Sequence, residues 1–199
     1  MTRFIYLLRR IPKALLFIAA GLIQIGMVGA MVVDRTSILR EGTEVTLQTR
    51  PIDPRDLLRG DYVTLGYAIS SFSSPNLVDQ PSNGKNTQVY VKLAPNAEGF
   101  HVAVSVDREP IPVSGAEVLI RGRVIRGADC GKLRRSFCGS LGVNYGIERY
   151  FVPEGEGRAI EQARNRSNVT VVAAVTRDGR ATIKRLLIDG KPVYDEPLF

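Results

Sequence analysis

The chain has 199 residues, 44% of them hydrophobic, and a formal net charge of +7 at pH 7. This length favours one folded domain with enough apolar side chains for a real core. The positive charge is mild and scattered beyond the N-terminus, so it argues against a nucleic-acid partner.

An uncharged apolar segment runs from Ala14 to Val33. Its length matches the roughly 30 Å hydrocarbon core of a bilayer, which about 20 helical residues cross. No acidic residue occurs before Asp34, whereas four basic residues precede the segment: Arg3, Arg9, Arg10 and Lys13. By the positive-inside rule, residues 1–13 form a cytoplasmic basic tail, residues 14–33 a transmembrane anchor in contact with membrane lipid, and residues 34–199 an extracytoplasmic domain.

A cleaved signal peptide is the alternative interpretation of this segment, because Val28-Gly29-Ala30 has the small residues that a signal peptidase tolerates. The apolar run nevertheless continues to Val33 and exceeds the usual core of about 7–15 residues. An uncleaved single-pass anchor is therefore favoured. Gly26 and Ala30 form a small-xxx-small pair, a pattern that lets another membrane helix approach.

The rest of the chain is predicted to be mainly β, because apolar and polar residues alternate in several runs. These runs are Glu44–Thr49, Tyr62–Ala68, Gln88–Ala94, Phe100–Val104 and Ala116–Arg126. In the fourth run, Phe100, Val102 and Val104 are expected on the buried face. The fold class is thus one antiparallel β-rich domain with a minor helical part, following an N-terminal transmembrane helix.

The clearest hairpin is predicted from Val169–Thr176 and Ala181–Ile188, because Asp178-Gly179 between two apolar runs is a strong turn signal. Asp189-Gly190 predicts a further turn. One short helix is expected over Glu156–Ala163, where apolar residues share a face.

The two cysteines, Cys130 and Cys138, lie close together in the sequence. In an oxidising exterior such a pair favours a disulfide across a loop, and two free thiols are the alternative. Together with the lone His101 they do not supply four zinc ligands, so no metal and no cofactor is expected.

The most specific cluster of residues begins at Asp53. Asp53 suits a helix N-cap, Asp56 a capping-box acid and Gly60 a terminating left-handed residue, so Asp53–Gly60 predicts one helical turn. Helix capping is therefore favoured over catalysis for the two aspartates. Asp61 is expected to hydrogen-bond in the turn before the next strand.

Two tyrosines follow in that strand. Tyr62 is expected on the sheet face opposite Leu65 and Tyr67. Because a tyrosine on each face is often structural, with a buried ring and a hydroxyl at the wet edge, packing is favoured over ligand contact.

Residues 60–67 read Gly-Asp-Tyr-Val-Thr-Leu-Gly-Tyr and match the pattern G-D-Y-x-x-L-x-Y at Gly60, Asp61, Tyr62, Leu65 and Tyr67. The chain therefore resembles the GDYXXLXY family of membrane-anchored bacterial proteins. The lead-in around Arg55 and the segments Tyr150–Gly155 and Leu186–Tyr194 also resemble this family. The resemblance implies a domain on the periplasmic side of the bacterial inner membrane that works with a multi-pass membrane protein. It implies no reaction and no catalytic residues.

A second cluster contains Tyr145, Glu148, Arg149 and Tyr150. If Val143–Phe151 is one strand, Tyr145 and Arg149 share one face, and Glu148 and Tyr150 share the other. A sheet edge with solvated charges is favoured. The alternative is a binding lip formed with Tyr62 and Tyr67, because aromatic residues and arginine anchor protein contacts.

Three functions remain open. An accessory or interaction protein that docks a membrane partner is favoured over an enzyme. A sensor of a small envelope ligand is the alternative, with a pocket lined by Tyr62 or Tyr67 together with Tyr145 or Arg149. A hydrolase or peptidase built on Asp53, Asp56 and Asp61 is less favoured. Type I signal peptidases have a similar layout, but residues 41–60 lack the serine that their chemistry needs.

Overall fold

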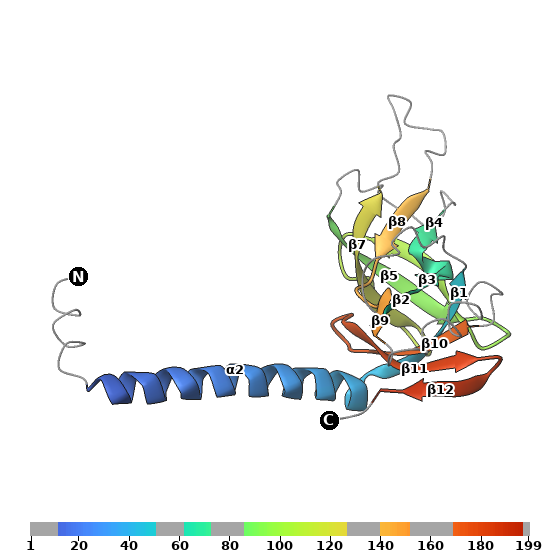
Figure 1. The fold of residues 1–199 in the computed structure, drawn as a ribbon. Coiled ribbons are helices and arrows are strands. Elements are labelled where there is room, and N and C mark those ends of the chain that lie inside the picture. The colour runs from blue at the N-terminus through green and yellow to red at the C-terminus, as the bar shows by residue number, and fades with distance from the viewer. Residues whose placement is uncertain (1–11, 51–61, 73–85, 127–139, 152–168, 197–199) are drawn as a thin grey trace. The chain divides into compact units, whose positions relative to one another are not determined.

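The computed structural model describes residues 12–50, 62–72, 86–126, 140–151 and 169–196. Within them, an N-terminal helix is followed by a domain built from antiparallel strands (Figure 1). The predicted fold class is therefore confirmed. The helical turn over Asp53–Gly60, the helix over Glu156–Ala163 and the pair Cys130 and Cys138 lie outside the described residues.

The helix, α2 (Lys13–Glu41), is long and apolar enough to cross a membrane. Its exposed hydrophobic side chains lie all around the helix axis, among them Phe17, Ile23 and Ile25. Its 29 residues span about 43 Å, so it continues beyond the predicted anchor. Its last turn belongs to the β-domain, where Ile38 and Leu39 are buried.

One sheet of the β-domain has five strands in the order β12-β11-β10-β1-β3. These are β1 (Thr43–Arg50), β3 (Gly66–Tyr67), β10 (Val169–Val175), β11 (Ala181–Ile188) and β12 (Lys191–Asp195). The predicted hairpin is confirmed as β10 and β11, and Gly179 adopts φ 83° in its turn. The predicted turn at Asp189-Gly190 is also confirmed, since both residues have positive φ between β11 and β12.

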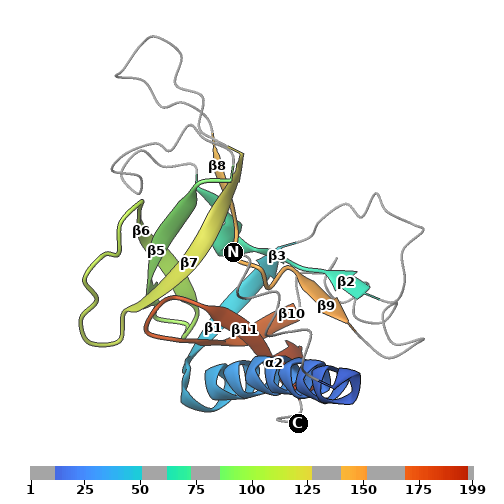
Figure 2. The same ribbon diagram turned by 90° about the vertical axis from the view of Figure 1, so that its left-hand side faces the viewer.

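The second sheet has the order β4-β8-β7-β5-β6. Its strands are β4 (Ser71–Phe72), β5 (Gln88–Pro95), β6 (His101–Asp107), β7 (Val118–Arg126) and β8 (Leu141–Asn144). A 3-10 turn, η1 (Ala68–Ser70), links β3 to β4. A small third sheet pairs β2 (Tyr62–Thr64) with β9 (Arg149–Phe151), as Figure 2 shows.

The inner faces of the two five-stranded sheets share one hydrophobic core. β1 contributes Val45 and Leu47, and β5 contributes Val89, Val91 and Leu93, as the alternation predicted. Because apolar burial contributes about 25 cal/mol per Å², this shared core is the main stabilising feature of the domain.

Two hydrogen bonds donated by backbone amides also join the sheets, at strand edges where no described strand pairs. The Thr46 amide donates to Nδ1 of His101 at 3.1 Å, on the part of β1 that β3 does not cover. The Arg121 amide of β7 donates to the carbonyl of Gly179 at 2.8 Å. A buried backbone N–H without a partner is costly, so these bonds stabilise the contact between the sheets.

Three strand predictions differ from the structure. Val102 and Val104 are each 41% exposed, so the predicted buried face of β6 is wrong. An irregularity in the β5–β6 pairing next to Lys92 shifts the alternation, and Ala103 and Val106 pack on the core instead.

The segments Tyr62–Ala68 and Val143–Phe151 are not single strands. The first breaks at Leu65 between β2 and β3, and the second breaks between β8 and β9. In each case the two halves join different sheets. Gly146, with φ 83°, turns the chain between β8 and β9, because this backbone conformation ends a strand and suits glycine.

Candidate functional site

The second half of the G-D-Y-x-x-L-x-Y pattern lies along a segment that we call the motif segment, residues 62–72. It runs antiparallel to residues 141–151, the opposing segment. β2 pairs with β9 at one end of the two segments, and β4 pairs with β8 at the other. Between these ladders the Leu65 amide donates to the carbonyl of Glu148 at 2.7 Å.

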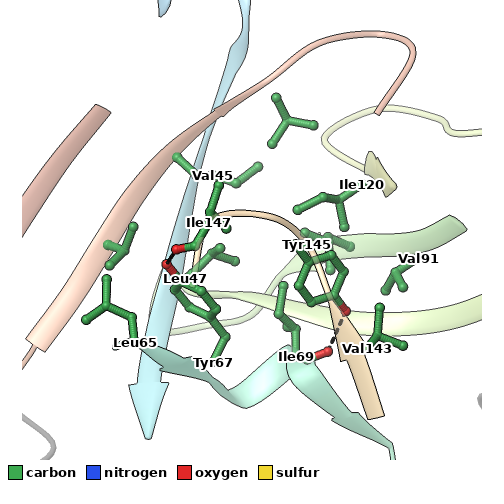
Figure 3. Close-up of a cluster of buried hydrophobic side chains, with 14 of the residues drawn as sticks. Val45, Leu47, Leu65, Tyr67, Ile69, Val91, Ile120, Val143, Tyr145 and Ile147 are labelled. Carbon is green, nitrogen blue, oxygen red and sulfur yellow. Dashed lines mark hydrogen bonds between the residues drawn. The ribbon is translucent and has the colours of Figure 1, made fainter. Parts of the chain in front are cut away.

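Two tyrosines join the middle of these segments, where the two segments do not pair with each other as strands. The hydroxyl of Tyr67 donates to the carbonyl of Ile147 at 2.6 Å, and the hydroxyl of Tyr145 donates to the carbonyl of Ile69 at 2.5 Å. Each segment therefore supplies one tyrosine and one carbonyl, and we call this pair of bonds the tyrosine clasp (Figure 3). The clasp replaces the ladder hydrogen bonds that the broken strands cannot make.

Both rings of the clasp lie in the core, with exposed fractions of 2% for Tyr67 and 7% for Tyr145. Burial raises the pKa of both hydroxyls well above the usual value, and the nearby charge of Glu148 raises them further. Both tyrosines are therefore neutral hydrogen-bond donors at any physiological pH.

Glu148 caps the turn that leads out of β8. Its carboxylate accepts hydrogen bonds from the amides of Tyr145 at 2.5 Å and Gly146 at 2.9 Å. Burial raises its pKa, and this effect outweighs the lowering by the backbone amides. The Glu148 side chain thus folds back onto the backbone of the turn, whereas its neighbour Arg149 is exposed.

Tyr150 is the third buried tyrosine of this region, at 4% exposed. Its ring packs edge-to-face on Tyr194 of β12, with the ring centroids 5.2 Å apart. Its hydroxyl is buried and has no hydrogen-bond partner among the described residues, and burial raises its pKa. An aromatic contact therefore holds this side chain, in contrast to the two hydrogen-bonded tyrosines of the clasp.

The structure brings Leu65, Tyr67, Tyr145, Glu148 and Tyr150 together, but inside the protein. Leu65 is fully buried in the core. For Tyr62 only the backbone is described, paired with Phe151. The remaining predicted site residues, Asp53, Arg55, Asp56, Gly60 and Asp61, lie outside the described residues.

A surface cleft of about 410 Å³ lies beside the clasp, where β8 leaves the second sheet. The residues that line it include Gln88, Arg121, Arg123, Asn144, Tyr145 and Gly146. Only Tyr145 belongs to both the clasp and the cleft. In the described part of the chain, no group of three or more histidine, cysteine or acidic residues is placed to hold a metal ion.

Comparison with known protein families shows to which family this chain belongs. The family model described as GDYXXLXY protein matches residues 24–186. The chain belongs to the GDYXXLXY family. No curated protein matches the chain, and no solved structure matches it.

Within this GDYXXLXY protein, the leucine and the second tyrosine of the family pattern are core residues. The expectation that the Tyr67 ring packs in the protein is confirmed, but its hydroxyl bonds Ile147 in the interior and does not lie at a wet edge. The sequence drew no attention to Arg121, Arg123 and Asn144, which line the cleft. The available signal was the alternation in β7, which places both arginines on the face opposite Ile120 and Val124.

Proposed function

We propose that this protein is an accessory protein of the bacterial inner membrane, anchored by α2, that binds a multi-pass membrane protein. The observation that carries the proposal is the composition of α2, which is apolar on every face for most of its length. A helix of this kind in water would expose its hydrophobic side chains, whereas a bilayer solvates them.

The orientation follows from the charges next to the apolar segment. The basic residues before Ala14 and the first acid at Asp34 favour a cytoplasmic N-terminus. The β-domain is then periplasmic, and it begins close to the outer surface because the helix ends at Glu41. The connection to the anchor is short, which favours partners that are themselves in the membrane.

The partner contact is proposed to lie within the bilayer, on the face of α2 that carries Gly26 and Ala30. A Cβ atom added at Gly26 would meet no atom within 4 Å. Small residues four positions apart leave a shallow groove in which a second helix packs closely. This face is therefore expected to pack against a transmembrane helix of the partner.

Site-specific photo-crosslinking in native membranes tests this proposal. A photoreactive residue at Gly26 should give an adduct with one membrane protein, and the same residue at Val28, about 200° around the helix, should give much less. Recovery of monomer alone, of homodimer alone, or of equal adducts from both positions would refute a specific partner at this face.

The orientation is tested separately with protease added to spheroplasts. Digestion of the β-domain from outside agrees with the proposal, and protection until the membrane is opened contradicts it.

A second candidate function, binding of a small ligand in the envelope, is supported by the cleft beside Tyr145. The cleft differs from the expected pocket, because Tyr67 is in the core and does not line it. The hydrolase alternative gains no supporting observation, since Asp53, Asp56 and Asp61 lie outside the described residues.

A further inference from the structure

The cleft beside the clasp is rich in hydrogen-bond donors. Arg121 and Arg123 of β7 line it, and Asn144 lies opposite Arg123 in the pairing of β7 with β8. Among the described residues that line the cleft, none is acidic. One carboxylate, that of Glu148, accepts hydrogen bonds from the amides of Tyr145 and Gly146, which line the cleft. The two guanidinium groups outnumber it, so the net charge around the cleft is positive.

The Arg121 guanidinium makes no hydrogen bond or ion pair with any residue that the structure describes. The turn beside it contains one acid, Asp178, but this carboxylate accepts hydrogen bonds from Thr176 at 2.5 Å and Arg180 at 2.8 Å. Asp178 is therefore already paired and does not neutralise Arg121, although the Gly179 carbonyl next to it binds the Arg121 amide.

The other donors are also available for a ligand. Among the residues that the structure describes, Arg123 contacts only Asn86, at 3.4 and 3.5 Å, which leaves most of its N–H groups without a described partner. Asn144 accepts a hydrogen bond from the Gly146 amide through its side-chain oxygen at 3.0 Å. Its amide NH₂ group therefore remains as a donor.

We propose that this cleft binds an oxyanion, either a phosphate or a carboxylate group. The planar guanidinium of arginine matches both groups because it donates two parallel hydrogen bonds to their oxygens. A volume of about 410 Å³ also admits a small organic molecule that carries such a group. This site goes beyond the docking role of α2, since it depends on residues of the β-domain alone.

The test is a titration of the full chain in zwitterionic micelles with inorganic phosphate, and separately with acetate, at constant ionic strength. Amide chemical shifts of Gly122 and Gly146 report on the cleft. We expect a saturable shift with at least one anion. The double variant Arg121→Gln with Arg123→Gln should weaken binding roughly tenfold or more, because charge-assisted hydrogen bonds are lost.

Two matched variants separate a site from general charge attraction. Arg121→Lys keeps the charge but loses the paired donors, so its affinity should lie between those of wild type and the double variant. Lys191→Gln removes an exposed charge from the edge of the other sheet and should leave binding unchanged. Equal weakening by Lys191→Gln and the double variant would overturn the proposal.

A further arm distinguishes a soluble ligand from a lipid headgroup. Micelles doped with phosphatidylglycerol should reproduce the amide shifts if a headgroup is the natural anion, and should leave them unchanged if the ligand is soluble. Absence of saturable shifts in all arms, or wild-type affinity in the double variant, would refute an oxyanion site. The unfolding midpoint of each variant serves as the control for folding.

Discussion

Removing one oxygen atom from each of two buried tyrosines should change the stability of the β-domain in different ways. Tyr67→Phe removes a hydrogen bond of 2.6 Å and leaves the buried carbonyl of Ile147 without its donor. Tyr150→Phe removes a buried hydroxyl that has no partner in the part of the chain that the structure describes. The two changes are chemically identical, so the difference between them isolates the hydrogen bond.

The expected magnitudes follow from the environment of each oxygen. An unsatisfied buried group costs about 1–3 kcal/mol, so Tyr67→Phe should lower the free energy of unfolding by about 2 kcal/mol. That is roughly 4–8 °C in the unfolding midpoint for a domain of this size. Tyr150→Phe should be neutral or raise the stability, because it removes a desolvated hydroxyl that gains nothing in return.

Thermal unfolding of the full chain in detergent, followed by near-ultraviolet circular dichroism, measures these shifts. Tyr90→Phe is the control, since the Tyr90 hydroxyl bonds Gln88 at 2.8 Å on the exposed surface and its loss should change little. A midpoint for Tyr67→Phe equal to that of Tyr150→Phe would refute the clasp as a stabilising feature.

Three further changes test other parts of the fold. Burial raises the pKa of Glu148 above 4.5. The stabilising contribution of this side chain is therefore present below pH 4.5 and is lost as pH rises through the raised pKa. Glu148→Gln should abolish this pH dependence of the free energy of unfolding. Burial lowers the pKa of His101 below 6.5, so its contribution to stability is present above pH 6.5 and is lost as pH falls towards the lowered pKa. The free energy of urea unfolding of His101→Gln should not change with pH in this window. The same pH dependence in this variant as in wild type would contradict the argument. Gly42→Ala places a Cβ 3.0 Å from the Cβ of Ala174 and should lower the free energy of unfolding in urea by about 1–3 kcal/mol. Gly29→Ala in α2 places a Cβ where no atom lies within 4 Å and should not lower it.

The sequence was sufficient for the elements whose signals are local. The β10–β11 hairpin was predictable because Gly179 and two apolar runs mark it, and β5 because Val89, Val91 and Leu93 alternate without a break. The apolar helix was predictable for the same reason, since almost every residue of the apolar segment carries the signal.

The remaining features depend on contacts between distant residues. The inverted face of β6 follows from its irregular pairing with β5 and from the bond between His101 and Thr46, 55 positions earlier. The clasp tyrosines bond carbonyls 80 and 76 positions away, and no local pattern identifies these partners. The cleft likewise needs β7 and β8 in register before Arg123 and Asn144 lie opposite each other.

The placement of β1 has a consequence for how the chain matures. β1 is synthesised first among the strands, yet it lies between β3 and β10, and the Thr49 hydroxyl bonds the carbonyl of Val169, 120 positions later. Val45 and Leu47 therefore stay without their main neighbours until the C-terminal hairpin has emerged. A product that terminates before β10 would keep the apolar helix α2 but display an unpaired apolar strand, which makes it a target for quality-control proteases.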